Sequence, residues 1–348
     1  MLKVAARILP SPNPIYGVGS DMRPPILGSW NLRDKRFLQP TSIRSYGLLY
    51  LPGSRAIADH QLQEFIRSMQ NGFANVGVTV PVHLPAYLKG NPQGDLKQII
   101  TELLAKTASA FKRKADLLLI LIHSSQEKLY RALKNICDVR LGVVSQVMQV
   151  EKALGRGQPQ YIANIALKVN AKMGGLNSRI SEPLFQAQKK RWMMMGGDVT
   201  HPSPAQLRMN PPPPSFTAIS GSYDRDCCLF SSITSAQGAK EELIGDLAVM
   251  TKELIERFRI QQDGRLPESI LYWRDGVSES QFQQVLGVEV AALKESCLSF
   301  GINPPKITVI CCVKRHHIRL FPLDRGDENG NCPPGTIVEN SSGHDFCE

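Results

Sequence analysis

The chain has 348 residues, of which 42% are hydrophobic, so its length and composition allow two or three domains that each bury a core. No apolar run reaches the length of a membrane-spanning helix, the N-terminus has no signal-peptide pattern, and no cysteines form the C-x-x-C pairs of a zinc site; we therefore expect a soluble intracellular protein. The formal charge of +10 favours a polyanionic partner such as nucleic acid.

The first 45 residues are rich in Pro, Gly and Arg and show little periodicity, which predicts an extended linker. From residue 46 onwards, apolar runs alternate with segments of helical spacing. The predicted strands cover 47–52, 117–123 and 141–150. One predicted helix follows Asp59, which is its candidate cap. The other predicted helices cover 95–111, a segment that starts at about 126, and 160–173. This alternation indicates an α/β unit with a largely parallel sheet over 46–175.

A second predicted unit begins near residue 184. A strand over 191–200 precedes a proline-containing loop over 201–215, and 216–223 and 227–235 then resemble two strands of a meander. Further strands are predicted over 268–276 and 306–313, and helices over 239–258 and 278–299. The four prolines from Pro211 to Pro214 are the only low-complexity tract.

Acidic residues stand at the predicted strand ends of the second unit. Asp198 follows GG in GGDVTHP, Asp275 ends YWRD, and Glu242 lies on the predicted helix between them. Because ligands bind at strand ends of open α/β sheets, two carboxylates there would attract Mg²⁺ or Mn²⁺, and two such ions can activate water against a phosphodiester. An aspartate beside glycine is also an ordinary turn signal, and a helical glutamate is commonly solvated, so spacing alone leaves both interpretations open.

Basic and polar residues recur at helical spacing in the first unit. Tyr130 and Lys134 share one helix face, and Lys168 and Lys172 repeat the spacing on a later helix. With Gln146 on the strand between, these side chains would suit a terminal phosphate, since Lys supplies charge, Tyr stacks or donates, and Gln donates. Two solvated helical faces would give the same spacing.

Four sequence strings resemble a known family. GGDVTHPSPAQ, EELIGDL, LYWRDGVSESQFQQVL and KRHHIRLF occur in this order and resemble the PIWI domain of eukaryotic Argonaute proteins. The resemblance implies an RNase H-like fold that cuts RNA paired to a guide. By motif, Asp198 and Asp275 match the metal-binding aspartates, and Glu242 matches the glutamate that completes the catalytic site. By the same resemblance, the cationic run in KRHHIRLF would contact the guide backbone through Lys314, Arg315, His317 and Arg319. Without the resemblance, this run would be interpreted as a charged segment where the chain leaves a strand.

The strings KLYRALK, GVVSQVM and NIALKVNAKMGG resemble MID-domain motifs that hold the 5′ phosphate of a guide. By this resemblance Tyr130 would stack on the first base, while the phosphate would be contacted by Lys134, Gln146, Lys168 and Lys172. Ser124, Ser125 and Gln126 match the loop that senses the 5′ base.

The resemblance covers nearly the whole chain and departs from the family at its end. The family's fourth catalytic residue, a His or Asp, lies well beyond KRHHIRLF, whereas this sequence ends at GHDFCE. We therefore expect three of the four site residues. The expected organisation is α/β throughout: a linker over 1–45, a Rossmann-like MID domain over 46–183, and a partial RNase H-like PIWI domain over 184–348.

The function that the resemblance implies is guide small-RNA binding in RNA-mediated gene silencing. The implied partners are a single-stranded guide, a complementary target RNA and silencing-complex proteins, with no membrane, and Mg²⁺ or Mn²⁺ as cofactor if the site is catalytic. Three alternatives remain: an RNA-guided endoribonuclease, a binding module without cleavage, and a truncated product that does not fold stably. The expected location is the cytoplasm, with the nucleus as a second location.

Overall fold

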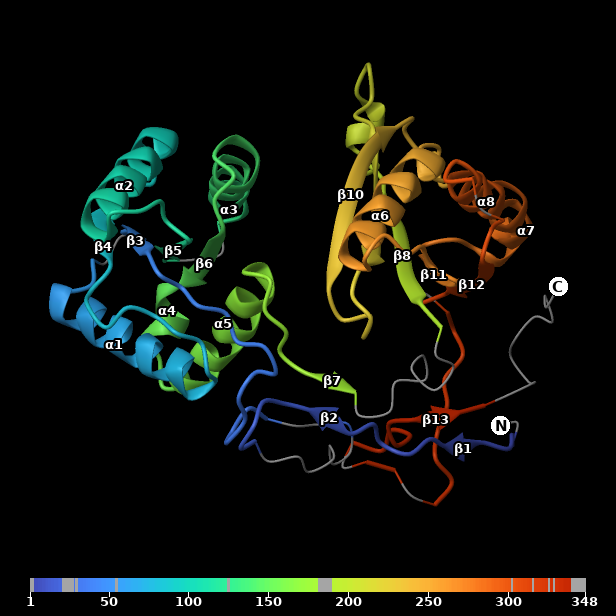
Figure 1. Cartoon of the computed structure of the whole chain (residues 1–348), viewed down its shortest axis with the longest axis horizontal. Coiled ribbons are helices and arrows are strands. Elements are labelled where there is room, and N and C mark those ends of the chain that lie inside the picture. Colours follow the sequence, from blue (N-terminus) through green and yellow to red (C-terminus); the bar gives the residue numbers. More distant parts are fainter. Residues whose placement is uncertain are drawn as a thin grey trace. The chain divides into compact units, whose positions relative to one another are not determined.

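The computed structural model describes residues 3–20, 28, 31–53, 56–123, 126–180, 190–301, 303–314, 316–324, 326–327 and 329–338. The chain divides into two compact units, one of residues Ser11–Ser181 and one of Met1–Pro10 with Glu182–Glu348. Each unit has helices packed on a β-sheet (Figure 1), which confirms the predicted α/β fold class. No helix in these described ranges is long and apolar enough to cross a membrane.

The unit Ser11–Ser181 is built on a four-stranded parallel sheet in the order β4-β3-β5-β6. Its strands are β3 (Tyr46–Leu51), β4 (Ala86–Lys89), β5 (Leu117–Ile122) and β6 (Ser145–Gln149). Every residue of β3 and β5 is buried. A parallel sheet covered on both faces needs apolar side chains at successive positions, which is why LLLILI forms a central strand.

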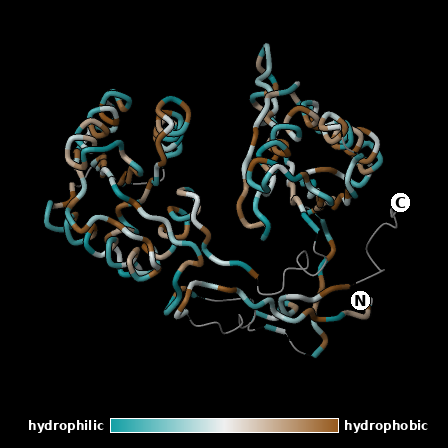
Figure 2. Tube along the Cα trace, in the orientation of Figure 1, coloured by the Kyte–Doolittle hydropathy of each residue, from teal (hydrophilic) through white to brown (hydrophobic). Residues whose placement is uncertain are grey.

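Helices cover both faces of this sheet (Figure 1). One face packs against α1 (Asp59–Asn75), the short α4 (Val150–Ala153) and α5 (Gln158–Lys172). The other packs against α2 (Leu96–Phe111), α3 (Glu127–Lys134) and the π-helical turn η1 (Asn135–Arg140). Along the helices in Figure 2, hydrophobic and hydrophilic residues are interspersed, as expected when one face of each helix lies on a sheet.

Several predicted boundaries in this unit are wrong. Strand β6 starts at Ser145 instead of residue 141, because Gly142 has a φ of +60°, which a strand does not allow, and Val150 already begins α4. Asp59 is the first helical residue of α1, not its cap. The predicted end of α5 at the two glycines is confirmed, with Gly174 at a φ of +82°.

The described part of 1–45 contributes side chains to the core as well as connecting chain. Tyr16, Phe37 and Ile43 are buried, and Phe37 and Ile43 belong to the cluster beneath α1 and α5. A two-residue strand, β2 (Pro14–Ile15), also pairs with β7 (Arg179–Ile180) at the other end of the unit's sequence. The lack of periodicity in 1–45 thus predicts its extended chain but not its buried anchors.

The other unit contains a five-stranded mixed sheet in the order β10-β9-β8-β11-β12. Its strands are β8 (Trp192–Thr200), β9 (Ser215–Ser222), β10 (Phe230–Gln237), β11 (Ser269–Asp275) and β12 (Lys306–Cys312). Strands β9 and β10 form the predicted antiparallel meander. Strand β8 extends it by pairing antiparallel with β9, whereas β11 runs parallel to both β8 and β12. The helices α6 (Leu247–Gln261) and α8 (Val290–Leu298) pack on one face of this sheet (Figure 1). A separate ribbon pairs β1 (Arg7–Ile8) with β13 (Thr336–Ile337).

The predicted helix over 239–258 is wrong at its N-terminal end. Helix α6 starts only at Leu247, so Glu242 lies on the loop between β10 and α6. The side chain of Gln237 replaces helical hydrogen bonds there: its Nε2 donates to the carbonyls of Glu241 and Leu243, and its Oε1 accepts from Gly245 N. These three hydrogen bonds thus satisfy part of the loop backbone without a helix.

The predicted helix over 278–299 is interrupted. A single 3₁₀ turn, η3 (Glu279–Gln281), leads into α7 (Phe282–Gln284), the π-helical turn η4 (Val285–Glu289) and α8. The π-helical turn ends at Glu289, whose side chain is fully buried and bonded inside the unit. Such turns depart from the 3.6-residue period, so apolar spacing alone does not reveal them.

Candidate functional site

The two predicted aspartates meet at one edge of the five-stranded sheet. Strands β8 and β11 are parallel and pair Gly197 with Arg274, so the next residues, Asp198 and Asp275, stand beside each other at the carboxyl ends of their strands. Both line a cavity of about 1400 Å³ together with Glu242. The three acidic residues predicted from sequence therefore share one cavity, although Glu242 reaches it from a loop.

Two side chains hold Glu242 in this cavity. His201 Nε2 lies 2.7 Å from Glu242 Oε2, and His201 Nδ1 lies 2.8 Å from Ser215 Oγ. Arg274 Nη2 donates to Glu242 Oε1 at 3.2 Å and also to the backbone carbonyl of Glu242. These contacts fix both the loop and the carboxylate, whose side chain is only 16% exposed.

Arg274 is itself anchored by a fully buried ion pair. Its Nε lies 3.0 Å from Glu289 Oε1, and both side chains are 0% exposed. Glu289 also accepts from the Tyr272 hydroxyl at 2.9 Å and from Ile244 N at 3.2 Å. Burial would lower the pKa of Arg274, but the charge and hydrogen bonds of Glu289 leave that pKa raised, and burial with the Glu289 charge raises the pKa of Tyr272. Arg274 is therefore a permanent cation behind the cavity.

This buried network was missed from sequence. The sequence signal that could have revealed it is the alternation of side chains along β11. Ile270 and Tyr272 point into the core, so Arg274, at the next alternate position, must also point inward. A buried arginine requires a buried acidic partner.

Asp275 and Asp198 have different partners. Asp275 Oδ2 forms an ion pair with Lys314 Nζ, and this hydrogen bond and the Asp275 charge raise the pKa of Lys314. Asp198 Oδ1 accepts from Val199 N at 2.9 Å. Lys314, whose side chain is 73% exposed, thus supplies a positive charge where a metal ion would otherwise balance the aspartates.

The chemistry of the donors suits a hard divalent cation. Asp198, Glu242 and Asp275 offer only carboxylate oxygens, the ligand type that Mg²⁺ and Mn²⁺ prefer. At Gly276, a Cβ would lie 3.3 Å from both Asp198 Oδ1 and Glu242 Oε1, so these oxygens border one small space that the glycine leaves open. Among the described residues, however, no group of three or more His, Cys, Asp or Glu side chains is arranged to hold a metal ion. Asp198 and Asp275 could hold a cation once Lys314 is displaced.

The predicted cationic run divides between the cavity and other positions. Lys314, His316 and His317 line the cavity. Arg319 instead turns its Nη1 onto the backbone carbonyls of His316 and Ile318, at 2.8 Å each. Arg315 lies outside the described residues.

A second cavity, of about 570 Å³, lies in the unit Ser11–Ser181 at the carboxyl edge of its parallel sheet. Three of the predicted phosphate-binding residues line it, namely Tyr130 from α3, Gln146 from β6 and Lys168 from α5. Tyr130 is 47% exposed, which leaves its ring available for stacking. Gln126 also lines this cavity, whereas Ser124 and Ser125 lie outside the described residues.

The other two predicted residues converge behind Gln146. Lys134 Nζ donates to Ser145 Oγ at 2.9 Å and to Asp138 Oδ1 at 2.8 Å. Lys172 Nζ donates to the Ser145 carbonyl and to Gln146 Oε1, at 2.9 Å each. Burial lowers the pKa of Lys172, and the charges of Lys134 and Lys168 lower it further, with Asp138 opposing them.

The structure thus brings the five residues into one basic cluster at the cavity, in which an added anion would relieve repulsion between lysines.

The prediction omitted several neighbours of this cluster. Ser145 and Asp138 bind the lysines, and Lys152 and Tyr161 line the cavity, with the Tyr161 hydroxyl accepting from Gln149 N at 3.0 Å. Lys152 lies three residues after Gln149, within the turn that follows β6, where sequence spacing gives little indication of direction.

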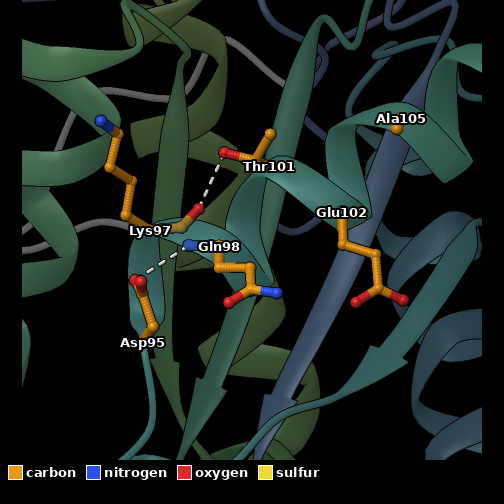
Figure 3. A pocket seen from close by; sticks show the side chains of 6 residues that line it. All are labelled: Asp95, Lys97, Gln98, Thr101, Glu102 and Ala105. Atoms are coloured by element: carbon orange, nitrogen blue, oxygen red, sulfur yellow. Dashed lines mark hydrogen bonds between the residues drawn. The ribbon is translucent and has the colours of Figure 1, made fainter.

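A third concavity lies on the first turns of α2 and has no comparable chemistry. Figure 3 shows that its lining comes from one helix, with no side chains converging from elsewhere. Its polar groups serve that helix: Asp95 accepts from Gln98 N at 3.0 Å, and Thr101 Oγ1 donates to the Lys97 carbonyl at 2.8 Å. It offers nothing beyond an open helix surface.

Comparison with known proteins supports the family resemblance. The sequence pattern of the family described as "Piwi domain" matches residues 116–347, and that described as "Mid domain of argonaute" matches residues 24–106. The protein argonaute of Schizosaccharomyces pombe is 32% identical over 354 residues, which cover 99% of this chain and 41% of that protein. The chain thus spans about two fifths of the length of this relative.

Solved structures agree with the fold. The structure of Kluyveromyces polysporus Argonaute with a guide RNA matches with a TM-score of 0.80 at 22% identity, over 97% of this chain and 41% of that chain. The C-terminal lobe of a budding yeast Argonaute matches with a TM-score of 0.84 at 21% identity, over 98% of this chain and 74% of that chain. The predicted combination of a Rossmann-like and an RNase H-like unit is confirmed.

Proposed function

The chain belongs to the Argonaute family, and on that premise we propose that it binds the 5′-phosphate end of a single-stranded guide small RNA in RNA-mediated gene silencing. The observation that carries the proposal is the convergence of Lys134 and Lys172 on Ser145 and Gln146 beside an open cavity. Lysines held this close favour an anion strongly, because a terminal phosphate adds negative charge and several acceptors.

Each predicted residue has a role in this proposal. Tyr130 stacks on the first base, and its exposure at the cavity suits that role. Lys168, with no competing ion pair among the described residues, and Gln146 contact the phosphate from the cavity wall. Lys134 and Lys172 supply charge from behind the wall. The guide RNA in the K. polysporus Argonaute structure supports the choice of ligand.

The test is the affinity of this chain for a fluorescent single-stranded RNA with a 5′ phosphate, compared with the same RNA bearing a 5′ hydroxyl. We expect tighter binding of the phosphorylated RNA and loss of that preference in Lys134→Ala and Lys168→Ala. Lys128→Ala is the matched control, because Lys128 is an exposed lysine of α3 that does not line the cavity. Equal affinities for the two RNAs would refute the proposal.

The acidic cavity forms a second part of the proposal, a metal-dependent site for cutting a complementary target RNA. Asp198 and Asp275 would hold Mg²⁺ or Mn²⁺, and Glu242 would complete the site. When bound, such ions activate water and stabilise the charge that develops on the phosphodiester. Arg274 and His201 keep Glu242 inside the cavity, and Gly276 leaves it the room. His317 and Lys314 would contact the guide backbone beside this site.

A non-cleaving guide-binding module is the second candidate, and the ion pair of Lys314 with Asp275 favours it. While Lys314 is bound to Asp275, the two aspartates have little affinity for a metal cation, and a cation can bind only after this ion pair opens. The two candidates are separated by incubating the RNA-loaded chain with a complementary RNA and Mn²⁺. Cleavage lost in Asp198→Asn supports the first candidate, whereas intact target with a bound guide supports the second.

The same proposal divides the chain into a linker over 1–45, a MID domain over 46–183 and a PIWI domain over 184–348. In it, the MID domain captures the guide and the PIWI domain acts on the target. A location in the cytoplasm, with the nucleus as a second location, and contacts to silencing-complex proteins also belong to it.

A further inference from the structure

The loop between β8 and β9 carries a motif that guide binding does not use. Residues 208–214 read RMNPPPP, so Arg208 precedes Pro211 by three residues, and Pro211 precedes Pro214 by three. Each of the first three prolines is followed by another proline, which restricts it to the polyproline II region. The sequence therefore sets the backbone of this segment before any partner is present.

The tract is exposed and unused within the chain. Arg208, Asn210, Pro211, Pro212 and Pro214 are all exposed. No turn or loop hydrogen bond among the described residues involves the backbone of the four prolines, and prolines have no N–H to donate. The Arg208 side chain likewise has no hydrogen bond or ion pair to a described residue. The carbonyls of the four prolines and the guanidinium of Arg208 are thus available to bind a partner.

The rest of the loop holds the tract in place. The loop closes at its base, where Thr200 pairs with Phe216 and His201 Nδ1 lies 2.8 Å from Ser215 Oγ. The 3₁₀ turn η2 (Gln206–Arg208) precedes the tract. Because consecutive prolines restrict the backbone of the tract before binding, less conformational entropy is lost when a partner docks.

We propose that this loop docks a protein domain of SH3 type, whose aromatic-lined groove takes Pro211 and Pro214 and whose acidic residues pair with Arg208. A polyproline II helix repeats every three residues, so Pro211 and Pro214 lie on one ridge and Pro212 lies off it. Grooves of this type read such a ridge, and the preset backbone reduces the entropic cost of binding. A basic residue at this spacing favours a groove with an acidic rim over other proline-binding grooves.

The proposal is tested by titrating the full chain into several ¹⁵N-labelled SH3 domains that bind peptides with an arginine three residues before PxxP. We expect saturable shifts confined to the aromatic groove and acidic rim of at least one domain. The double variant Pro211→Ala/Pro214→Ala should weaken that binding at least about tenfold, and Arg208→Ala should weaken it to a smaller extent.

Pro212→Ala is the matched control, because it removes a proline of the same tract from outside the ridge and should leave the affinity within about twofold. All four positions are exposed, so the variants should melt like the parent chain. The proposal falls if no domain in the series binds the chain while each binds its control peptide. It also falls if Pro212→Ala weakens binding as much as the double variant.

Discussion

Arg274 and Glu289 form an ion pair in which neither side chain has any solvent exposure. The pair joins the end of β11 to the π-helical turn η4, and from it Arg274 reaches Glu242 in the acidic cavity. A buried pair contributes little net stability but makes loss of one partner costly, because the remaining charge has no solvent. The site at the cavity therefore depends on a residue that does not line it.

Glu289→Gln should destabilise the chain by about 3–5 kcal/mol, because it leaves Arg274 buried without its counter-charge. Urea unfolding followed by circular dichroism measures this loss. The double variant Arg274→Met/Glu289→Leu removes both charges and should recover most of the lost stability. A loss below about 1 kcal/mol in the single variant would show that the pair is solvated in solution.

Gly276→Ala should lower the affinity of the chain for Mn²⁺ and destabilise the fold by about 1–3 kcal/mol. The residue has a φ of +92°, and an added Cβ would approach Asp198 Oδ1 and Glu242 Oε1 to 3.3 Å. Manganese binding by electron paramagnetic resonance and urea unfolding provide the two readouts. Gly287→Ala is the control, because no atom beyond its chain neighbours and its own helical backbone lies within 4 Å of its added Cβ. Equal behaviour of the two variants would contradict the account of the cavity.

Lys314→Ala should raise the affinity of the chain for Mn²⁺ several-fold, since it removes the cation that neutralises Asp275. Lys306→Ala removes a lysine from the opposite end of β12 and should leave Mn²⁺ affinity unchanged. Isothermal titration with Mn²⁺ compares the three proteins without requiring cleavage. Unchanged or weaker binding in Lys314→Ala would mean that Lys314 does not compete with the metal.

Binding of a 5′-phosphorylated RNA should weaken as the pH rises through the lowered pKa of Lys172, below the ordinary lysine value of 10.5. The charged form of Lys172 attracts the phosphate, so its deprotonation removes affinity. Lys172→Arg should shift this weakening to higher pH, because a guanidinium stays charged. Titrations between neutral pH and about pH 10 measure it. Identical pH profiles for the two proteins would contradict this role.

The same pKa shift predicts a stability change of known sign. The folded chain releases the Lys172 proton more readily than the unfolded chain, whose lysine titrates near 10.5. The free energy of unfolding should therefore rise with pH from the lowered pKa to about 10.5. Lys172→Met should reduce this rise in urea unfolding across the same range, and a slope unchanged by the substitution would refute the assignment.

The sequence predicted those features of the fold that depend on local pattern. Continuous apolar runs such as 117–122 predicted central strands, because two-sided burial removes polar positions. Helical spacing placed Tyr130 and Lys134 on one helix and Lys168 and Lys172 on another. The features it missed depend on partners distant in sequence. Gln237 replaces a turn of helix at Glu242, and Glu289 meets Arg274 across fifteen positions.

The most direct test of guide binding is a double-mutant cycle between the RNA terminus and Lys172. Affinities are measured for RNAs with a 5′ phosphate or a 5′ hydroxyl, each with the parent chain and with Lys172→Met. If the lysine cluster binds the terminal phosphate, removing the phosphate should weaken binding to the parent far more than binding to the variant. If the two losses simply add, the phosphate is bound elsewhere and the central claim is contradicted.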